Sequence, residues 1–418
     1  MSAASKVSAL APFRVRSFRF QWPADLATSC AFEMETLILG WYVLVETGSV
    51  LLLTVFASLQ TLGTLIAPMF GVMGDRIGLR NLLGAMRAVY AGLAALLMTF
   101  AYTGVLTPMH VLAIAAIAGM VRPSDIGMRM ALVGDTMPGA RLMAAMSIQR
   151  TTQDFARIVG AMTGAGLVAW LGMGPAYSVV ASLYAISVVL TMKVDRARIT
   201  HAHGSSQVAR PSPWRDLREG LAYVWRTPHM LAVMLLAFML NMTTFPQMTA
   251  LLPYVAKEVY LADQTWLGYM VAAGATGALL SSIMVSRYGG GIRPARVMLV
   301  SSAAWCVMLL LFAHSQHAAA GVSALMLAGC MQSLSQIPMA ALLLRTSHQH
   351  LRGRVMGIRM LAIYGNLPGL LMAGPLISLL GYPATATLYC IIGLASTLLI
   401  GMRWRADLWR VGAPANSR

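Results

Sequence analysis

Long apolar runs, separated by short polar segments, extend over most of the sequence. A helix that crosses a bilayer needs roughly 20 predominantly apolar residues, and twelve runs reach about that length. The expected helices lie at about 20–44, 50–72, 82–103, 108–130, 144–171, 175–193, 228–254, 265–286, 296–314, 319–344, 355–380 and 383–403. The pattern therefore predicts an all-α integral membrane protein with twelve transmembrane helices.

One polar interruption, residues 194–227, divides these helices into two groups of six. Its first part, around His201 and His203, has the composition of a flexible linker. Its second part predicts an amphipathic helix at the membrane surface. The apolar face of that helix would carry Trp214, Leu217, Leu221, Val224 and Trp225. The expected organisation is an N-terminal half at 1–193, a linker at 194–227, a C-terminal half at 228–403 and a cytoplasmic tail at 404–418.

Composition agrees with this pattern. The chain is 58% hydrophobic and only 11% charged, with a mean hydropathy of +0.69. A soluble domain carries about 25% charged residues, so the polar surface that a water-soluble globule needs is missing. Soluble enzymes are therefore excluded.

The charge distribution predicts the orientation in the membrane. Basic residues outnumber acidic ones by 31 to 14, and they gather in alternate loops. Arg76, Arg80 and Arg87 follow the second expected span, and residues 193–226 hold seven more basic residues. Because cytoplasmic loops are enriched in Lys and Arg, we expect both termini and the middle loop to be cytoplasmic. Membrane orientation thus explains the excess of basic over acidic residues, and we expect no nucleic-acid partner.

A ten-residue motif follows the second expected span. It contains Gly71, Gly74, Asp75, Arg76, Gly78 and Arg80. It resembles the Gly-x-x-x-Asp-Arg-x-Gly-Arg-Arg signature of the major facilitator superfamily, except that Leu79 replaces the first arginine of the closing pair. The resemblance implies two six-helix halves, transport by alternating access, and a gating role for this loop. Its arginines can bind the carbonyl end of a helix or lipid phosphate.

Shorter segments resemble one branch of that superfamily, the enterobactin exporter and macrolide-efflux relatives. They are Arg122-Pro123 and residues 131–135, 156–160, 217–224 and 352–356. The branch implies export across a bacterial inner membrane, with a siderophore or similar metabolite, or a hydrophobic drug, as cargo. The glycine-rich antiporter motif of exporters is degraded here, because Ala161 replaces its proline and Ala165 replaces one of its glycines.

Charged residues inside the expected spans are functional candidates, because an ionised group costs several kcal/mol at membrane depth. The proton-coupling candidates are Glu33, Arg122, Asp125, Asp154 and Arg157. They would form an acid–base network that links the first, fourth and fifth helices. The alternative is that Asp125 and Asp154 only neutralise nearby arginines, such as Arg129 and Arg150. Asp25 and Glu35 also lie in the first span, and Glu33 and Glu35 cannot share a helical face.

The expected spans of the second half carry almost no charge. Their polar and aromatic residues instead suit an uncharged or amphipathic solute. The substrate-cavity candidates are Asn241, Phe245, Gln332, Gln336, Tyr364 and Asn366. Pro338, Pro368 and Pro375 are expected to kink or break helices near such a site.

No catalytic constellation, nucleotide-binding loop or metal-ligand spacing stands out in the sequence. We expect no enzyme activity, no metal, and no cofactor beyond a proton gradient. The hypothesis is therefore a functional monomer in the lipid bilayer that exports a small-molecule substrate in exchange for protons. An importer of the same fold, a lipid flippase and a non-transporting sensor remain alternatives.

The gating motif offers a first test. If the loop acts as the resemblance implies, Asp75→Asn should reduce transport strongly while the protein still reaches the membrane. Uptake or efflux by cells that express equal amounts of both proteins measures this. An unchanged phenotype would favour the non-transporting sensor.

Overall fold

Every regular element in the described part of the structure is helical. The computed structural model describes residues 11–64, 66–195, 213–288, 293–346, 355, 358–359 and 362–411. The expected flexible linker around His201, most of the segment 352–356 and the end of the C-terminal tail lie outside the described residues.

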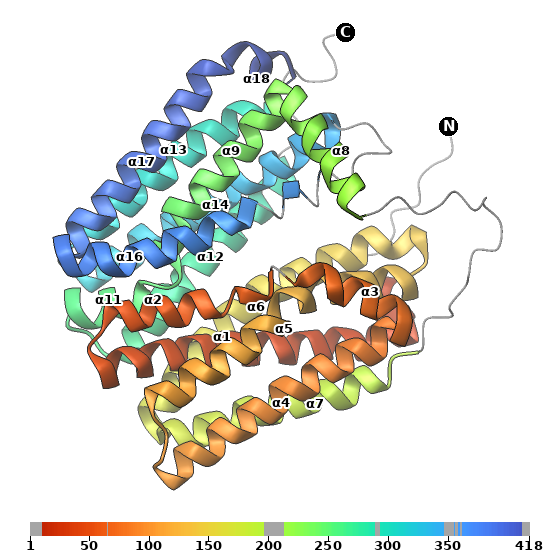
Figure 1. Cartoon of the computed structure of the whole chain (residues 1–418), viewed down its shortest axis with the longest axis vertical. Coiled ribbons are helices and arrows are strands. Elements are labelled where there is room, and N and C mark those ends of the chain that lie inside the picture. The colour runs from red at the N-terminus through yellow and green to blue at the C-terminus, as the bar shows by residue number, and fades with distance from the viewer. Residues whose placement is uncertain are drawn as a thin grey trace. The chain divides into compact units, whose positions relative to one another are not determined.

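The chain divides into two compact units. Unit 1 comprises Met1–His201 with Ala262–Ala272, and unit 2 comprises Ala202–Leu261 with Ala273–Arg418. The helices of unit 1 are η1 (Ala11–Arg14), α1 (Arg16–Thr47), α2 (Val50–Leu59), η2 (Leu62–Thr64), α3 (Ala67–Ile77), α4 (Leu79–Thr103), α5 (Pro108–Thr136), α6 (Gly139–Leu171) and α7 (Met173–Met192). In this unit α1 packs against α6 and α7, and α4 lies beside α7 (Figure 1).

Unit 2 contains the remaining helices, except that the first part of α12 belongs to unit 1. They are α8 (Pro213–Arg226), α9 (Pro228–Thr243), α10 (Phe245–Met248), α11 (Leu252–Tyr254), the π-helical turn η3 (Val255–Val259), α12 (Gln264–Tyr288), α13 (Pro294–His314), α14 (Ala318–Thr346), η6 (Ala362–Gly365), α16 (Asn366–Leu380), α17 (Tyr382–Arg403) and α18 (Arg405–Val411). Within this unit α13 packs against α14 and α17.

The helices confirm an all-α membrane protein. Nine helices among the described residues are long and apolar enough to cross a bilayer, and two shorter apolar segments lie at Val50–Thr64 and Pro228–Thr243. The remaining expected span, the first in the chain, is α1, a helix of 32 residues whose acidic and basic residues lower its hydropathy. Each of the twelve predicted spans is thus matched by one helix or by consecutive shorter helices.

The second and seventh spans are interrupted where the apolar pattern predicts continuous helices. In the eleventh span the 3-10 turn η6 comes just before α16 and Pro368, one of the prolines expected to kink or break a helix. α2 gives way to the 3-10 turn η2 before α3, and α9 ends at Thr243 before the short helices α10 and α11. Pro246 and Pro253 lie at the starts of α10 and α11, where the missing amide hydrogen costs least. By contrast, α14 continues through Pro338 and α16 continues through Pro375. Apolar periodicity alone could not distinguish these cases.

The amphipathic segment of the predicted linker is helix α8. Val224 is buried, whereas Leu221 is 48% exposed and Trp225 is 70% exposed. One residue of the predicted apolar face, Val224, therefore packs inside the protein, whereas Leu221 and Trp225 lie at its surface. An exposed tryptophan beside arginines is the arrangement expected of a helix at a membrane interface.

Glycines allow several helices to approach closely within each unit. A Cβ atom added to Gly119 on α5 would lie 2.0 Å from the carbonyl oxygen of Leu59 on α2. In unit 2, a Cβ on Gly369 of α16 would lie 2.1 Å from the carbonyl oxygen of Met242 on α9. These contacts bring backbone against backbone at the interrupted spans, where a larger residue has no space.

This packing predicts a position-dependent effect of adding one methyl group. Gly119→Ala should destabilise the protein by about 1–3 kcal/mol, because the Leu59 backbone has to move. Gly127→Ala on the same helix meets no atom within 4 Å and should be neutral or stabilising by up to about 1 kcal/mol. Thermal unfolding of both variants in detergent micelles measures the difference. Equal unfolding temperatures would contradict the close contact.

Candidate functional site

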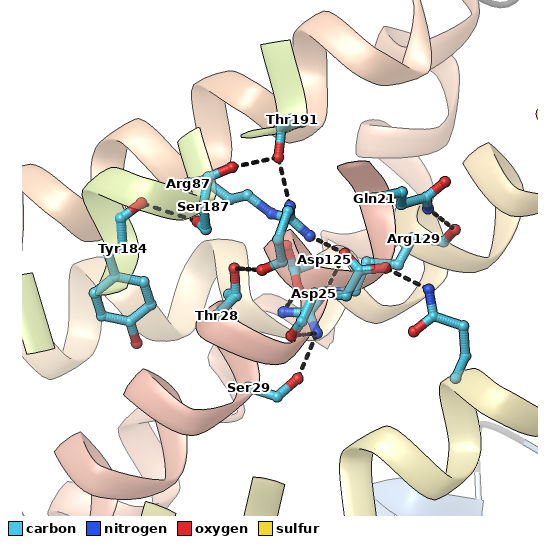
Figure 2. Close-up of polar contacts among 12 residues, drawn as sticks. Gln21, Asp25, Thr28, Ser29, Arg87, Asp125, Arg129, Tyr184, Ser187 and Thr191 are labelled. Atoms are coloured by element: carbon cyan, nitrogen blue, oxygen red, sulfur yellow. Dashed lines mark hydrogen bonds and ion pairs between the residues drawn. The ribbon is translucent and has the colours of Figure 1, made fainter. Parts of the chain in front are cut away.

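Five charged or polar side chains meet in the interior of unit 1. We call Asp25, Arg87, Asp125, Arg129 and Gln149 the Asp25 cluster; they come from α1, α4, α5 and α6. Asp25 forms an ion pair with Arg87 and accepts a hydrogen bond from the side chain of Gln149. Asp125 forms an ion pair with Arg129, whose Nε lies 3.9 Å from Asp25 Oδ1. Figure 2 shows these ion pairs gathered around Asp25.

The Asp25 cluster is almost completely inaccessible to solvent. Arg87 is 0% and Asp25 is 1% exposed, and its other members are also buried. Hydroxyl and backbone groups complete the contacts: Thr191 on α7 accepts from Arg87, and Ser29 Oγ accepts from Arg129 Nη1 at 2.7 Å (Figure 2). The two carboxylates balance the two guanidinium groups, so no net charge is buried. The ion pairs join α1, α4 and α5, and the hydrogen bonds of Gln149 and Thr191 add α6 and α7.

A second group of polar side chains lies further along α1. We call Glu35, Gln60, Arg122 and Tyr184 the Glu35 cluster. Arg122 donates from Nη2 to Glu35 Oε2 and from Nη1 to Gln60 Oε1, both at 2.6 Å. Tyr184 also donates its hydroxyl hydrogen to Glu35 Oε2, at 3.0 Å. Asp25 and Glu35 are ten residues apart, which is about 15 Å along a helix.

The helical repeat explains why both clusters use α1 and α5. Arg122, Asp125 and Arg129 have the spacing i, i+3, i+7, which places them along one face of α5. That face meets α1, where Asp25 and Glu35 supply carboxylates to both ends of the row. The guanidinium group of Arg122 also lies over the Phe32 ring, 3.6 Å from its centroid. Arg122 is thus held by charge, hydrogen bonds and a cation–π contact.

Glu33 lies on a different face of α1 and faces α6. Its Oε1 lies 3.6 Å from Arg157 Nε, which is longer than a hydrogen bond. The Glu33 side chain is 20% exposed and that of Arg157 is 38% exposed. Gly160 makes this approach possible, because a Cβ there would lie 2.9 Å from Glu33 Cβ. The pair is therefore less tightly held and more exposed than the two clusters.

The five predicted coupling residues do not form one group. Glu33 meets Arg157, Arg122 meets Glu35, and Asp125 meets Arg129. Asp154 is buried, and its Oδ2 lies 3.5 Å from Nε of Arg150, whose side chain is 67% exposed. Contacts do link α1, α5 and α6, the first, fourth and fifth spans. Glu33 and Glu35 have separate partners, as their positions on opposite faces require.

Sequence reasoning missed several members of these clusters. Arg87 is grouped with the loop residues by charge, although it lies two turns inside α4. Its position inside the expected span 82–103 was the available signal. Gln60, Gln149 and Tyr184 carry no charge, so nothing in the apolar pattern marked them as partners of a carboxylate or a guanidinium group.

The gating motif spans the junction of α3 and α4. Gly78 has a φ of 86° at this junction, a conformation that favours glycine. Arg80 Nη1 donates to the backbone oxygens of Met192 and Val194, at 3.4 and 3.1 Å, at the end of α7. Gly71 and Gly74 lie on α3 and the Arg76 side chain is exposed. The Asp75 side chain lies outside the described part of the structure.

The six substrate-cavity candidates lie in unit 2, on or beside the interrupted helices. Asn241 is buried and donates to the Ala237 backbone oxygen at 2.8 Å, and Gln336 Oε1 accepts from Arg359 Nη2 at 3.2 Å. Asn366 is 7% exposed, and its Oδ1 has no hydrogen-bond partner in the described part of the chain. Phe245, Gln332 and Tyr364 are half-buried. Sequence reasoning missed Gln247, a fully buried amide on α10.

Comparison with known proteins identifies the family. The model of the Major Facilitator Superfamily matches residues 26–373, which is most of the chain. The chain belongs to the Major Facilitator Superfamily. It is therefore a multi-pass membrane protein of a transporter family. No curated protein matches the chain significantly in sequence.

Solved structures of superfamily transporters share the fold. The nucleoside transporter NupG is 15% identical with a TM-score of 0.69, and the match covers 94% of this chain and 98% of that chain. The peptide transporter PepTSo of the POT family is 11% identical with a TM-score of 0.74, covering 94% and 99%. The human organic anion transporter MFSD10 is 16% identical with a TM-score of 0.63, covering 92% and 99%. At these identities the likeness shows the fold alone.

The Asp25 cluster predicts a large cost for removing one buried charge. Asp25→Asn or Arg87→Gln should each destabilise the protein by about 3–5 kcal/mol, because the remaining charge is buried without its partner. The double variant should lose less than the sum of the two. Arg150→Gln is the control, because the Arg150 side chain is 67% exposed and solvent screens its charge, so its loss should cost about 1 kcal/mol or less. Unfolding in detergent micelles measures all four, and additive losses would contradict the pairing.

Proposed function

We propose that this transporter exports a small molecule across the bacterial inner membrane in exchange for protons, by alternating access, with both termini in the cytoplasm. The observation that carries the proposal is the pair of Glu33 and Arg157 in the membrane-spanning part of unit 1. It combines an acid at membrane depth, partial exposure, and an ion-pair distance of 3.6 Å.

These properties suit a carboxylate that gains and loses a proton during transport. An acid in a membrane span needs a counter-charge or a proton. Glu33 has both within reach, because Arg157 lies beside it and its side chain is 20% exposed. Glu35, by contrast, is 7% exposed and has close contacts to Arg122 and Tyr184. We therefore assign proton exchange to Glu33 and a positioning role to the Glu35 cluster.

Protonation of Glu33 would change the charge balance between α1 and α6. When Glu33 is deprotonated, its negative charge neutralises Arg157. When Glu33 is protonated, the Arg157 guanidinium group has no counter-charge, and an arrangement in which water or an anion contacts it becomes more favourable. A proton can shift the transport equilibrium only through such a difference between states. Asp154 belongs to the same helix as Arg157 and adds a carboxylate that, unlike Glu33, is buried.

The proposed cargo follows from the polar groups of unit 2. The predicted spans there carry almost no charge, and their amides suit a solute that forms hydrogen bonds and contacts apolar side chains. A siderophore or similar metabolite has this character, and a hydrophobic drug is the nearest alternative. The resemblance to the exporter branch supports export. The relatives with this fold include transporters named for nucleosides and peptides, so import stays an alternative.

Proton movement in inverted vesicles tests the proposal. Vesicles that contain the transporter are given a preformed pH gradient, and siderophores and drugs are added in turn. One cargo class should dissipate the gradient, and Glu33→Gln or Asp154→Asn should abolish that response. Glu46→Gln is the matched control, because Glu46 is an exposed acid near the end of the same helix.

Three results would contradict the proposal. If no cargo moves protons through a folded protein, the coupling fails. If Glu33→Gln responds like Glu46→Gln, Glu33 is not the exchanging group. If labelled lipid moves and no solute does, the protein is a flippase.

A further inference from the structure

One side of helix α8 in unit 2 is exposed from Arg218 to Arg226. We call its residues the α8 stripe; they are Arg218, Leu221, Ala222, Trp225 and Arg226, and they line a shallow hollow of about 380 Å³. Their spacing of i, i+3, i+4, i+7 and i+8 places them along one side of a helix. All five side chains are exposed, Trp225 at 70%. The stripe is therefore accessible to a partner outside the chain.

A different side of α8 packs against the protein. Val224 is buried, and α8 contacts α9. Helix α9 begins at Pro228, two residues after α8 ends at Arg226. Because α9 is the apolar first part of a membrane span, its beginning lies near the bilayer surface. The α8 stripe is therefore held at the level of the lipid headgroups.

The α8 stripe has a positive charge at each end and apolar residues between. Arg218 and Arg226 are eight residues apart, which is about 12 Å along a helix. Guanidinium groups bind phosphate oxygens through paired N–H donors, and a tryptophan ring lies favourably at headgroup level. The stripe contains no acid, and Glu219 is turned about 100° away from Arg218 around the helix. This chemistry fits a lipid headgroup with a net negative charge.

The same end of unit 2 carries more basic and aromatic residues. Helix α18 packs against α9, α13 and α17, and Figure 1 shows α8 and α18 at one end of the unit. The Cζ atoms of Arg296 and Arg405 lie 5.2 and 5.8 Å from the centroid of the Trp409 ring. Helix α18 holds one acid, Asp407, but the sequence has no acidic residue at 264–406. The surrounding charge therefore also attracts an anion to this end.

We propose that the α8 stripe is a binding site for an anionic phospholipid. Arg218 and Arg226 contact the charged headgroup, and the Trp225 ring lies beside the glycerol and the upper part of the acyl chains. The partner is a lipid of the bilayer, because a free phosphate ion would leave the exposed apolar residues of the stripe uncovered. The site is independent of cargo and proton exchange, whose proposed groups lie on other helices.

Lipid binding to the full-length transporter tests the site. Protein stripped of lipid in detergent is titrated with phosphatidylglycerol or phosphatidylcholine, and the mass of the intact complex reports bound lipid. The test variants are Trp225→Ala and the double substitution Arg218→Gln with Arg226→Gln. The matched control is Arg16→Gln with Arg287→Gln, which removes the same charge from two exposed positions outside the stripe. Equal unfolding temperatures establish that each variant is folded.

We expect the double test variant to bind phosphatidylglycerol about 30-fold more weakly, since each arginine near a headgroup contributes about fivefold. The wild-type protein should bind phosphatidylglycerol more tightly than phosphatidylcholine, and salt should reduce this preference. Trp225→Ala should weaken the binding of both lipids alike, because the ring carries no charge. The control should bind both lipids as the wild-type protein does.

Four results would overturn the site. The wild-type protein may show no preference between the two lipids, or the control may lose as much affinity as the double test variant, so that overall charge explains the binding. Inorganic phosphate that displaces phosphatidylglycerol would assign the arginines to a free anion. A dimer that light scattering detects in the wild-type protein and not in the double test variant, with lipid binding unchanged, would assign the stripe to a second copy of the chain.

Discussion

A charge inside a membrane span needs an opposite charge, and the rest of unit 1 is arranged around that constraint. Asp25 and Arg87 are shielded almost completely from solvent, and Arg129 and Asp125 complete a neutral set beside them. The members of the Asp25 cluster come from four helices, α1, α4, α5 and α6. The ion pairs therefore specify which helices pack together and fix their relative positions along the helix axes.

The ion pairs along α1 differ in how tightly they are held. The Asp25 cluster is fully enclosed, the Glu35 cluster has slightly exposed guanidinium contacts, and the pair of Glu33 and Arg157 is loose and partly exposed. Tightly held pairs favour one packing, whereas a loose pair can exchange its partner at little cost. This gradient is the physical basis for assigning structure to the first group and proton exchange to the last.

Unit 2 shares with unit 1 the close approach of helices at glycines. Its interrupted helices α9 and α16 approach through glycines until backbone meets backbone, and amide side chains such as Gln247 are buried beside the breaks. Broken helices present backbone groups and short polar side chains where a continuous helix would present apolar ones. The proposal thus places proton chemistry in unit 1 and hydrogen bonding to cargo in unit 2.

The sequence by itself determined the number of spans, and several of their ends, such as Pro108, Leu171 and His314, because apolar length and loop composition are local properties. It also marked the acids and most of the arginines of unit 1, because a charge stands out in an apolar run. Only the tertiary structure decided the partners: Arg122 with Glu35, Arg87 with Asp25, and Tyr184 with Glu35. Each pair joins helices that are distant in the chain, and no local spacing encodes which faces meet.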